Sequence, residues 1–131
     1  MIVGIGNDVV ETRRILRAVE RHGAPFLRRV LAPDEQERAA AISHPDRLAE
    51  FVAGRFAAKE ALAKAVGCGL ARLSMPHVSV SIGQAGLYVT WQEASALWAQ
   101  FGPPEDARVR IHLALTHAAG VAFAVAVVEQ R

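Results

Sequence analysis

One long segment, which follows Pro45-Asp46 and runs to Val66, constrains most strongly what this chain can fold into. A helix is expected to begin after Pro45-Asp46, and Gly67 suits the residue after its end. Between them, apolar side chains recur at the three- and four-residue spacing of a helix face. These side chains are Leu48, Phe51, Val52, Phe56, Leu62 and Val66. The pattern predicts a single helix of about six turns, which would be the spine of the core.

Three shorter elements are predicted before this helix. The β-branched, glycine-rich residues 2–6 predict a buried strand that stops at residues 7–8. Asp8 and Glu11 have the spacing of an N-cap and its reciprocal partner, and they predict a helix that ends near Gly23. Pro33 followed by two acidic residues predicts a second, short helix.

Beyond the long helix the hydrophobic period changes from 3.6 to 2, which indicates strands. The predicted elements are strands at 78–82 and 87–91 around a turn at 83–86, a helix at 92–101, and strands at 109–116 and 121–128 around a tight hairpin at 117–120. This order predicts an α+β fold in which an antiparallel sheet packs on the long central helix. We expect one domain spanning residues 1–131, because the length suffices for one core.

Several classes of protein are excluded by composition. The longest apolar stretches have about eight residues, far fewer than the ~20 that cross a bilayer. The first residues lack the basic start and long apolar run of a secretory signal. The one cysteine, Cys68, cannot form an intramolecular disulfide, and no Cys/His spacing resembles a zinc site. We therefore expect a cytoplasmic protein without a membrane partner.

The positive charge is unevenly distributed along the chain. Residues 13–29 hold six arginines and one glutamate, a local charge of +5 within a net charge of +2. Such a face indicates an acidic partner, either a nucleic acid or an acidic protein helix, unless it is merely solvated. Lysine occurs only twice, at Lys59 and Lys64, both within the long helix.

Four charged side chains flank the apolar stripe of that helix. Arg55 and Lys59 are a like-charge pair four residues apart, and Glu60 and Lys64 are an opposite-charge pair. A solvated face would explain all four, but the rarity of lysine indicates that positions 59 and 64 need a compact ammonium group. Asp8 and Glu60 could be oxygen ligands of Mg²⁺, unless Asp8 only caps the following helix.

Three separated motifs resemble those of one family, the holo-acyl-carrier-protein synthases, which are small 4′-phosphopantetheinyl transferases. Residues 4–11 (GIGNDVVE) are similar to the family's G-x-G-x-D-x-x-E signature. Residues 55–67 (RFAAKEALAKAVG) match its R-F-A-A-K-E-A-x-x-K-A-x-G helix almost letter for letter. Residues 115–117 (LTH), before an Ala/Val-rich strand, are similar to its S-[IL]-[ST]-H element. The resemblance covers the whole chain in order, and the middle motif is the specific one.

The resemblance implies an enzyme that transfers the 4′-phosphopantetheine group of coenzyme A to a serine of apo acyl carrier protein. The reaction would release adenosine 3′,5′-bisphosphate, require Mg²⁺ and support fatty-acid or polyketide synthesis. By the same resemblance, Asp8 and Glu60 would hold the metal and, with Lys64, would be the catalytic residues. The implied coenzyme A contacts are Arg47, Arg55, Lys64, Gly67, Thr116 and His117. The acceptor of the serine proton stays open between a metal-bound water, Glu11 and Glu60.

The resemblance also implies partners for the arginine-rich face and for the chain itself. An acidic helix of the carrier protein would dock on Arg13, Arg14, Arg17, Arg21 and Arg29. The family is typically a homotrimer with its sites between subunits. The reaction that the resemblance implies involves no nucleic acid. Two departures are visible: Ala114 stands where the family usually has serine, and the turn at 84–87 lacks the expected proline.

Two alternatives compete with this interpretation. A basic nucleic-acid-binding module would account for the arginine-rich first helix, but it would leave the helix that carries both lysines unexplained. A non-catalytic homologue acting as a scaffold would not need Asp8, Glu60 and Lys64 together, so their joint presence argues against it.

Overall fold

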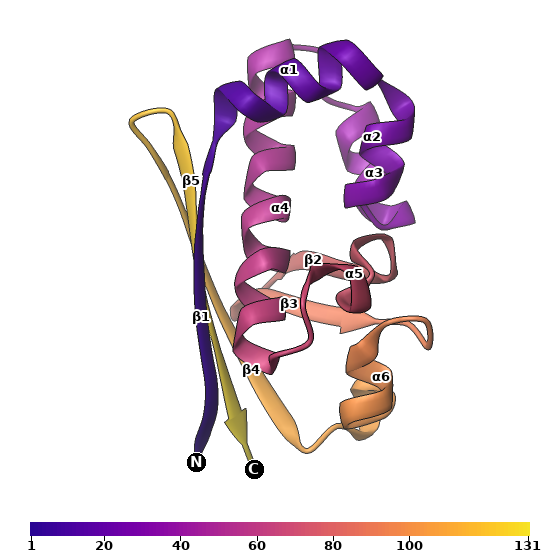
Figure 1. Ribbon diagram of the computed structural model, residues 1–131, viewed down its shortest axis with the longest axis vertical. Helices are drawn as coiled ribbons and strands as arrows, with labels where there is room; N and C mark the ends of the chain where they lie inside the picture. Colours follow the sequence, from indigo (N-terminus) through magenta and orange to yellow (C-terminus); the bar gives the residue numbers. More distant parts are fainter.

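A long helix, α4 (Pro45–Val66), lies along an antiparallel sheet in the computed structural model, which describes residues 1–131 (Figure 1). The helix ends at Val66 as predicted, but it begins at Pro45, two residues earlier than predicted, because Pro45 and Asp46 form its first turn. At its start the side chain of His44 accepts a hydrogen bond from the amide of Asp46 at 3.2 Å. At its end Gly67 adopts a left-handed conformation with φ of 73°, which only glycine reaches without strain.

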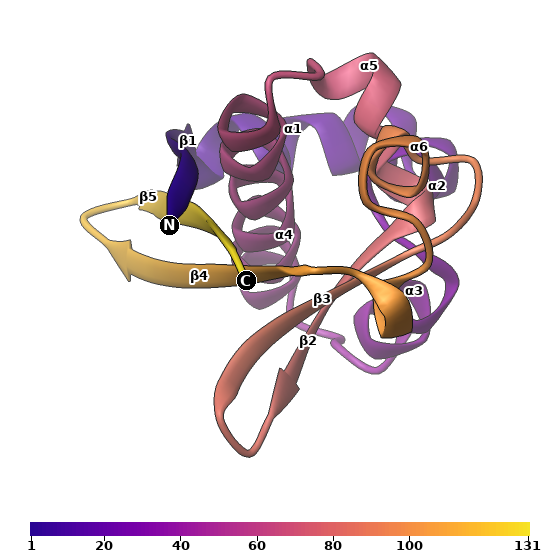
Figure 2. The ribbon, with the colours of Figure 1, turned by 90° about the horizontal axis from the view of Figure 1, so that it is seen from below.

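The sheet beside α4 has three strands in the order β1-β5-β4, and every pairing is antiparallel. The strands are β1 (Ile2–Glu11), β4 (Val109–Ala118) and β5 (Val121–Gln130). A separate two-stranded ribbon, β2 (Val78–Gly83) with β3 (Gly86–Trp91), protrudes from the body of the molecule (Figure 2). The α+β architecture, the ribbon and the final hairpin are therefore confirmed.

Short helices complete the structure. They are α1 (Thr12–His22), α2 (Ala24–Val30), α3 (Pro33–Ala40), α5 (Leu70–Leu73) and α6 (Ala96–Phe101), with 3₁₀ turns η1 (Met75–His77) and η2 (Pro104–Asp106). The predicted helix end at Gly23 and helix start at Pro33 are confirmed. Helices α2 and α5 were not predicted from the sequence, because they have seven and four residues and are too short to show a clear helical period.

The prediction that Asp8 caps the first helix is wrong. Asp8 lies within β1, and α1 starts at Thr12 after Glu11, which makes no side-chain capping bond. The strand is longer than predicted because its pairing with β5 continues to Glu11, opposite Val121. Backbone hydrogen bonds to the neighbouring strand thus override the local capping pattern.

Two further boundaries differ from the prediction. His117 belongs to β4, where it pairs with Ala122, and the turn is confined to Ala119 and Gly120, both with positive φ. The predicted helix at 92–101 starts only at Ala96, because the Ser95 side chain accepts a hydrogen bond from the Leu97 amide and caps it there.

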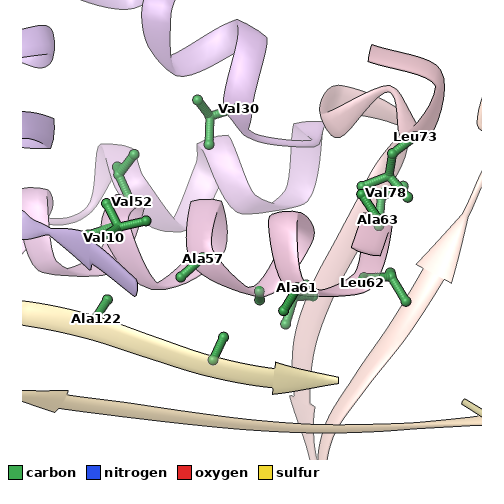
Figure 3. Packing of buried hydrophobic residues seen from close by; sticks show 14 of the residues in the cluster. Val10, Val30, Val52, Ala57, Ala61, Leu62, Ala63, Leu73, Val78 and Ala122 are labelled. Atoms are coloured by element: carbon green, nitrogen blue, oxygen red, sulfur yellow. The ribbon is translucent and has the colours of Figure 1, made fainter. Parts of the chain in front are cut away.

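Small residues let α4 and the sheet approach closely. Ala57 and Ala61 face β5 and are fully buried, and Ala122 points back toward the helix (Figure 3). In β1, a Cβ atom added at Gly4 or at Gly6 would overlap the backbone carbonyl of Ala65 or of Ala61, respectively. The strand therefore lies directly on the helix backbone, and this contact brings the next inward-facing residues of β1 to the side of α4.

Candidate active site

Asp8 and Glu60, predicted as metal ligands, converge although 52 residues separate them in the chain. Inward-facing residues of β1 alternate, so Asp8 points to α4 like Gly6, and Glu60 comes from α4 itself. Both line a cavity of about 290 Å³ that also includes Arg14 and is walled by apolar residues such as Ile15, Phe26 and Phe56.

The two carboxylates are close enough to affect each other's ionisation. Burial raises the pKa of Glu60, and the neighbouring carboxylate of Asp8 raises it further. The charges of Lys64 and Arg14 oppose this shift. One oxygen of Asp8, Oδ2, is buried without any hydrogen-bond partner. Two like charges and an unsatisfied oxygen together indicate a place for a cation.

Lys64 completes this cluster from the next turn of α4. Its Nζ donates hydrogen bonds to the carbonyl of Asn7 at 3.0 Å and to Oδ1 of Asp8 at 3.4 Å. The lysine side chain is 55% exposed, whereas that of Asp8 is 13% exposed. The structure contains no ion pair between Glu60 and Lys64, because Lys64 reaches across to β1 instead. The ammonium group therefore remains open to solvent and to a bound anion.

The donor set fits a hard divalent cation that is shared with a phosphorylated substrate. Mg²⁺ typically takes one or two carboxylates and completes its shell with water and phosphate oxygens. No group of three or more His, Cys, Asp and Glu side chains could enclose a metal ion anywhere in the chain. Asp8 and Glu60 thus suit Mg²⁺ at an open site and do not suit a closed, four-ligand structural site.

The arginines predicted to dock a partner are all exposed, and none of them forms an ion pair. Arg13, Arg14, Arg17 and Arg21 lie on α1, while Arg29 lies on α2. Arg14 also reaches the cavity beside Asp8 and Glu60. The basic surface is consequently continuous with the candidate site.

The predicted coenzyme A contacts are spread along α4 and β4. Gly67 lines a second cavity, of about 390 Å³, with Glu60 and Lys64. Arg47 is exposed in the first turn of α4. His117 faces α4, since a Cβ at Gly54 would lie 3.1 Å from its ring. About ten helical residues, or 15 Å, separate that point from Lys64.

Two of the predicted coenzyme A contacts, Thr116 and Arg55, do not face the same surface of the chain as the other four. Neighbouring strand residues point to opposite faces, so Thr116 faces away from α4 when His117 faces toward it. Arg55 is only 5% exposed, and its guanidinium lies over the ring of Phe51 at 4.5 Å. Its Nε and Nη2 atoms are buried without hydrogen-bond partners.

Sequence reasoning missed one buried polar residue, Glu35 of α3. Its carboxylate binds Lys59, which is fully buried, and it lies 3.8 Å from Nε of Arg55. Burial lowers the pKa of Lys59, and the charge of Glu35 opposes that shift. The interpretation of Arg55 and Lys59 as a solvated face is therefore wrong. The sequence did contain an indication of this acid, because Arg55 and Lys59 lie four residues apart beside the predicted apolar stripe and two buried cations need an acidic partner.

Another cavity, of about 540 Å³, contains none of the predicted catalytic residues. It lies between the β2–β3 ribbon and β4, and its walls include the turn Gly83–Gly86, Tyr88, Arg110 and Ile111. The turn forms without the expected proline, since Gly86 supplies the positive φ of 106° that the hairpin needs.

Comparison with known proteins assigns this arrangement to a family. Residues 4–124 match the family model described as the 4′-phosphopantetheinyl transferase superfamily. A holo-[acyl-carrier-protein] synthase from Marinomonas sp. is 39% identical over 132 residues and covers 100% of both chains. Another, from Azorhizobium caulinodans, is 43% identical over 120 residues, 88% of this chain and 85% of that protein.

Solved structures give the same result. A holo-[acyl-carrier-protein] synthase from Neisseria meningitidis superposes with a TM-score of 0.82 at 31% identity, covering 99% of this chain and 100% of that one. A holo-(acyl-carrier-protein) synthase from Bacillus anthracis, in complex with CoA (3′,5′-ADP), has a TM-score of 0.79 at 33% identity, covering 100% and 99%. These findings lend no support to a nucleic-acid-binding module. No helix has both the length and the apolar character needed to cross a membrane.

Proposed function

Because this chain belongs to the 4′-phosphopantetheinyl transferase superfamily, in its holo-[acyl-carrier-protein] synthase group, we propose that it moves the 4′-phosphopantetheine group of coenzyme A to a serine of an acyl carrier protein. Adenosine 3′,5′-bisphosphate is the other product, and the modified carrier serves fatty-acid or polyketide synthesis in the cytoplasm. The observation that carries the proposal is the convergence of Asp8, Glu60 and Lys64 beside two cavities.

Asp8 and Glu60 would hold Mg²⁺, and the buried, partnerless Oδ2 of Asp8 supports this assignment. When bound, the ion would supply positive charge that stabilises the 5′-phosphate of adenosine 3′,5′-bisphosphate as it leaves on cleavage of the pyrophosphate linkage. Lys64 contributes a second positive charge to the same phosphates through its exposed ammonium group. Phosphoryl transfer depends on positioning and on charge neutralisation, and these three side chains provide both.

The serine hydroxyl needs a proton acceptor, and Glu11 and Glu60 differ in where they lie relative to the candidate site. Glu11 is an outward-facing residue of β1, on the opposite face of the strand from Asp8. Glu60 lies in the site, where it shares a cavity with Asp8 and Arg14. We therefore favour Glu60 over Glu11 as the proton acceptor.

Coenzyme A would extend from Lys64 along α4 toward His117, with Gly67, Arg47, Arg55 and Thr116 as further contacts. Gly54, where His117 meets α4, lies about 15 Å along the helix axis from Lys64, a span that suits a long substrate. Since Thr116 faces the opposite side of the sheet, one chain alone cannot present all these groups to one molecule. This geometry supports a site completed by a second subunit.

A homotrimer is supported by the outer face of the three-stranded sheet, which no helix of the chain covers. Ile5 is 70% exposed there, Val9 57% and Phe123 38%. A contiguous apolar surface of this kind is typical of a protein interface. In the proposed trimer this face is buried between subunits, and the acidic carrier protein docks separately on the exposed arginines of α1 and α2.

The proposed function can be tested by mass spectrometry. The purified chain is incubated with coenzyme A, MgCl₂ and an apo acyl carrier protein, and the intact mass of the carrier is followed. We expect the carrier to gain one phosphopantetheine on a serine, to stop gaining it when EDTA is added, and to resume with excess Mg²⁺. Salt-sensitive binding of an arbitrary oligonucleotide without any transfer would refute the proposal and favour a nucleic-acid-binding module.

A further inference from the structure

The proposed reaction does not use the buried acid Glu35, yet this residue has more polar partners than any member of the site. Its Oε1 accepts hydrogen bonds from the amide of Ala32 at 2.8 Å and from Nζ of Lys59 at 2.5 Å. Its Oε2 accepts a hydrogen bond from the amide of Val80 at 2.9 Å. Glu35 therefore connects the start of α3, strand β2 and helix α4 inside the core.

Lys59 uses all three of its ammonium hydrogens in the same place. Besides Glu35, it donates to the carbonyl of Val30 at 2.6 Å and to the carbonyl of Met75 at 3.0 Å. These carbonyls lie at the end of α2 and at the start of η1, so one side chain of α4 is tied to three other segments. The arrangement defines both the rotation of α4 about its axis and its position along that axis.

The opposite side of α4 is fixed by β1. The backbone of the strand lies on Ala61 and Ala65 at Gly6 and Gly4, and Figure 1 shows β1 on one side of α4 and α2 and α3 on the other. Glu60 follows Lys59 directly, and Lys64 lies one turn later. A rotation of α4 by about 10° would move side-chain atoms 6–7 Å from its axis by roughly 1 Å, enough to cost about 10²-fold in rate.

We infer that Glu35 is a positioning residue, which acts through Lys59 to hold α4 in the rotation that presents Glu60 and Lys64 to Asp8. Arg55 cannot replace Lys59 in this role, because its Nε lies 3.8 Å from Glu35, too far for a hydrogen bond. The inference rests on the proposed function, since it concerns the geometry of that site.

The test separates positioning from stability with two variants. Glu35→Gln keeps the size of the side chain but leaves the buried ammonium of Lys59 without its counter-charge. Glu35→Gln combined with Lys59→Met removes both charges, so no unpaired charge is left buried, and we expect the double variant to be more stable than Glu35→Gln alone. The double variant still lacks the hydrogen bonds from the helix to Val30 and Met75.

Each variant is assayed well below its melting temperature, with the folded fraction checked by circular dichroism. The readouts are kcat for transfer, KM for the carrier protein, and Mn²⁺ affinity measured by electron paramagnetic resonance. We expect both variants to lose 10- to 100-fold in kcat and to bind Mn²⁺ more weakly, with KM for the carrier unchanged within about twofold. Leu97→Ala is the control, because Leu97 is fully buried in α6 and should lower stability without affecting kcat or Mn²⁺ binding.

The inference would be overturned if the double variant recovered kcat and Mn²⁺ affinity along with its melting temperature. Such a result would show that the loss in Glu35→Gln comes only from the unpaired charge of Lys59. The inference would equally be overturned if the folded Glu35→Gln protein behaved like Leu97→Ala. Absence of transfer by the wild-type protein would refute the proposed function itself, which keeps the two failures distinct.

Discussion

Replacing Gly6 by alanine should damage the site from a distance, because Gly6 sets the spacing between β1 and α4. The added Cβ would overlap the carbonyl oxygen of Ala61 and lie 2.7 Å from the amide nitrogen of Ala65. An ordinary contact needs at least 3.4 Å, so the nitrogen alone requires the strand to move away by roughly 0.7 Å, and the closer carbonyl oxygen requires a larger shift. Both neighbours are backbone atoms of a helix and cannot rotate away as a side chain would.

The expected cost is about 1–3 kcal/mol of stability, as for other overpacked cores. Asp8 follows two residues later on the same face of β1, so it should move by a similar distance relative to Glu60 and Lys64. A displacement approaching 1 Å at the reacting groups corresponds to a loss of up to about 10²-fold in kcat. The assay compares kcat for carrier modification, Mn²⁺ affinity and chemical denaturation of the variant with those of the wild type.

Gly102→Ala is the matched control. Gly102 has φ of 76° and ψ of −168°, a backbone conformation that is almost restricted to glycine, and no atom lies within 4 Å of an added Cβ, so alanine there causes backbone strain of about 1–3 kcal/mol without touching the site. We expect this control to lose stability and to keep its kcat and Mn²⁺ affinity. Normal activity and metal affinity in folded Gly6→Ala would refute the role assigned to the contact between β1 and α4.

Three further predictions concern the carboxylates, the sheet and the basic surface. Glu60→Gln should stabilise the metal-free protein at neutral pH by on the order of 0.5 kcal/mol after solvent screening. The pKa of Glu60 is raised in the folded protein, so ionisation of this side chain lowers the free energy of unfolding as the pH rises through that pKa, whereas glutamine does not ionise. Calorimetry in EDTA should show this gain vanish near pH 4, below the unfolded pKa, and a gain that persists there would contradict the reasoning. Ile5→Asp places a charge on the proposed interface and should convert the trimer into monomers in sedimentation equilibrium, whereas Ala24→Asp, on exposed α2, should not. A monomeric wild-type protein would refute the trimer. Arg21→Glu should raise KM for the carrier about tenfold, equivalent to ~1.4 kcal/mol, and should leave KM for coenzyme A unchanged. The control Arg108→Glu should change neither KM, and an equal rise of both KM values in Arg21→Glu would exclude a docking role.

The long helix and the two hairpins could be predicted because their signals are local. In α4 the proline, the apolar spacing and the terminal glycine all agree, and each of them depends only on neighbours in the chain. The identities of Asp8, Glu60 and Lys64 as a group came instead from the family resemblance. Their convergence depends on the contact of Gly4 and Gly6 with α4, which no local pattern reveals.

The errors have the same physical origin, since each concerns a contact between distant segments. Asp8 fits the capping pattern, but pairing of β1 with β5 places it within a strand. Lys59 fits an exposed helix face, but Glu35, 24 residues earlier, draws it into the core. Desolvation and ion pairing of this kind are decided by tertiary packing, whereas sequence spacing records only which residues share a helix face.

The arginines illustrate what sequence can and cannot distinguish. The local charge of +5 correctly indicated an exposed basic surface, and the structure shows that it borders the cavity with Asp8 and Glu60. Arg55 carries the same charge and lies in the most specific motif, yet it is buried beside Phe51. Charge alone therefore does not separate a docking residue from one held in the core.

The central claim is that Asp8 of β1 and Glu60 of α4 form one cation site that serves phosphopantetheine transfer. The most direct measurement is the initial rate of carrier modification, by intact mass, for Asp8→Asn, Glu60→Gln and Glu11→Gln at saturating coenzyme A and Mg²⁺. We predict that the first two variants lose at least about 10²–10³ in rate, while Glu11→Gln, on the other face of β1, keeps most of its activity. Wild-type rates in Asp8→Asn or Glu60→Gln would contradict the account.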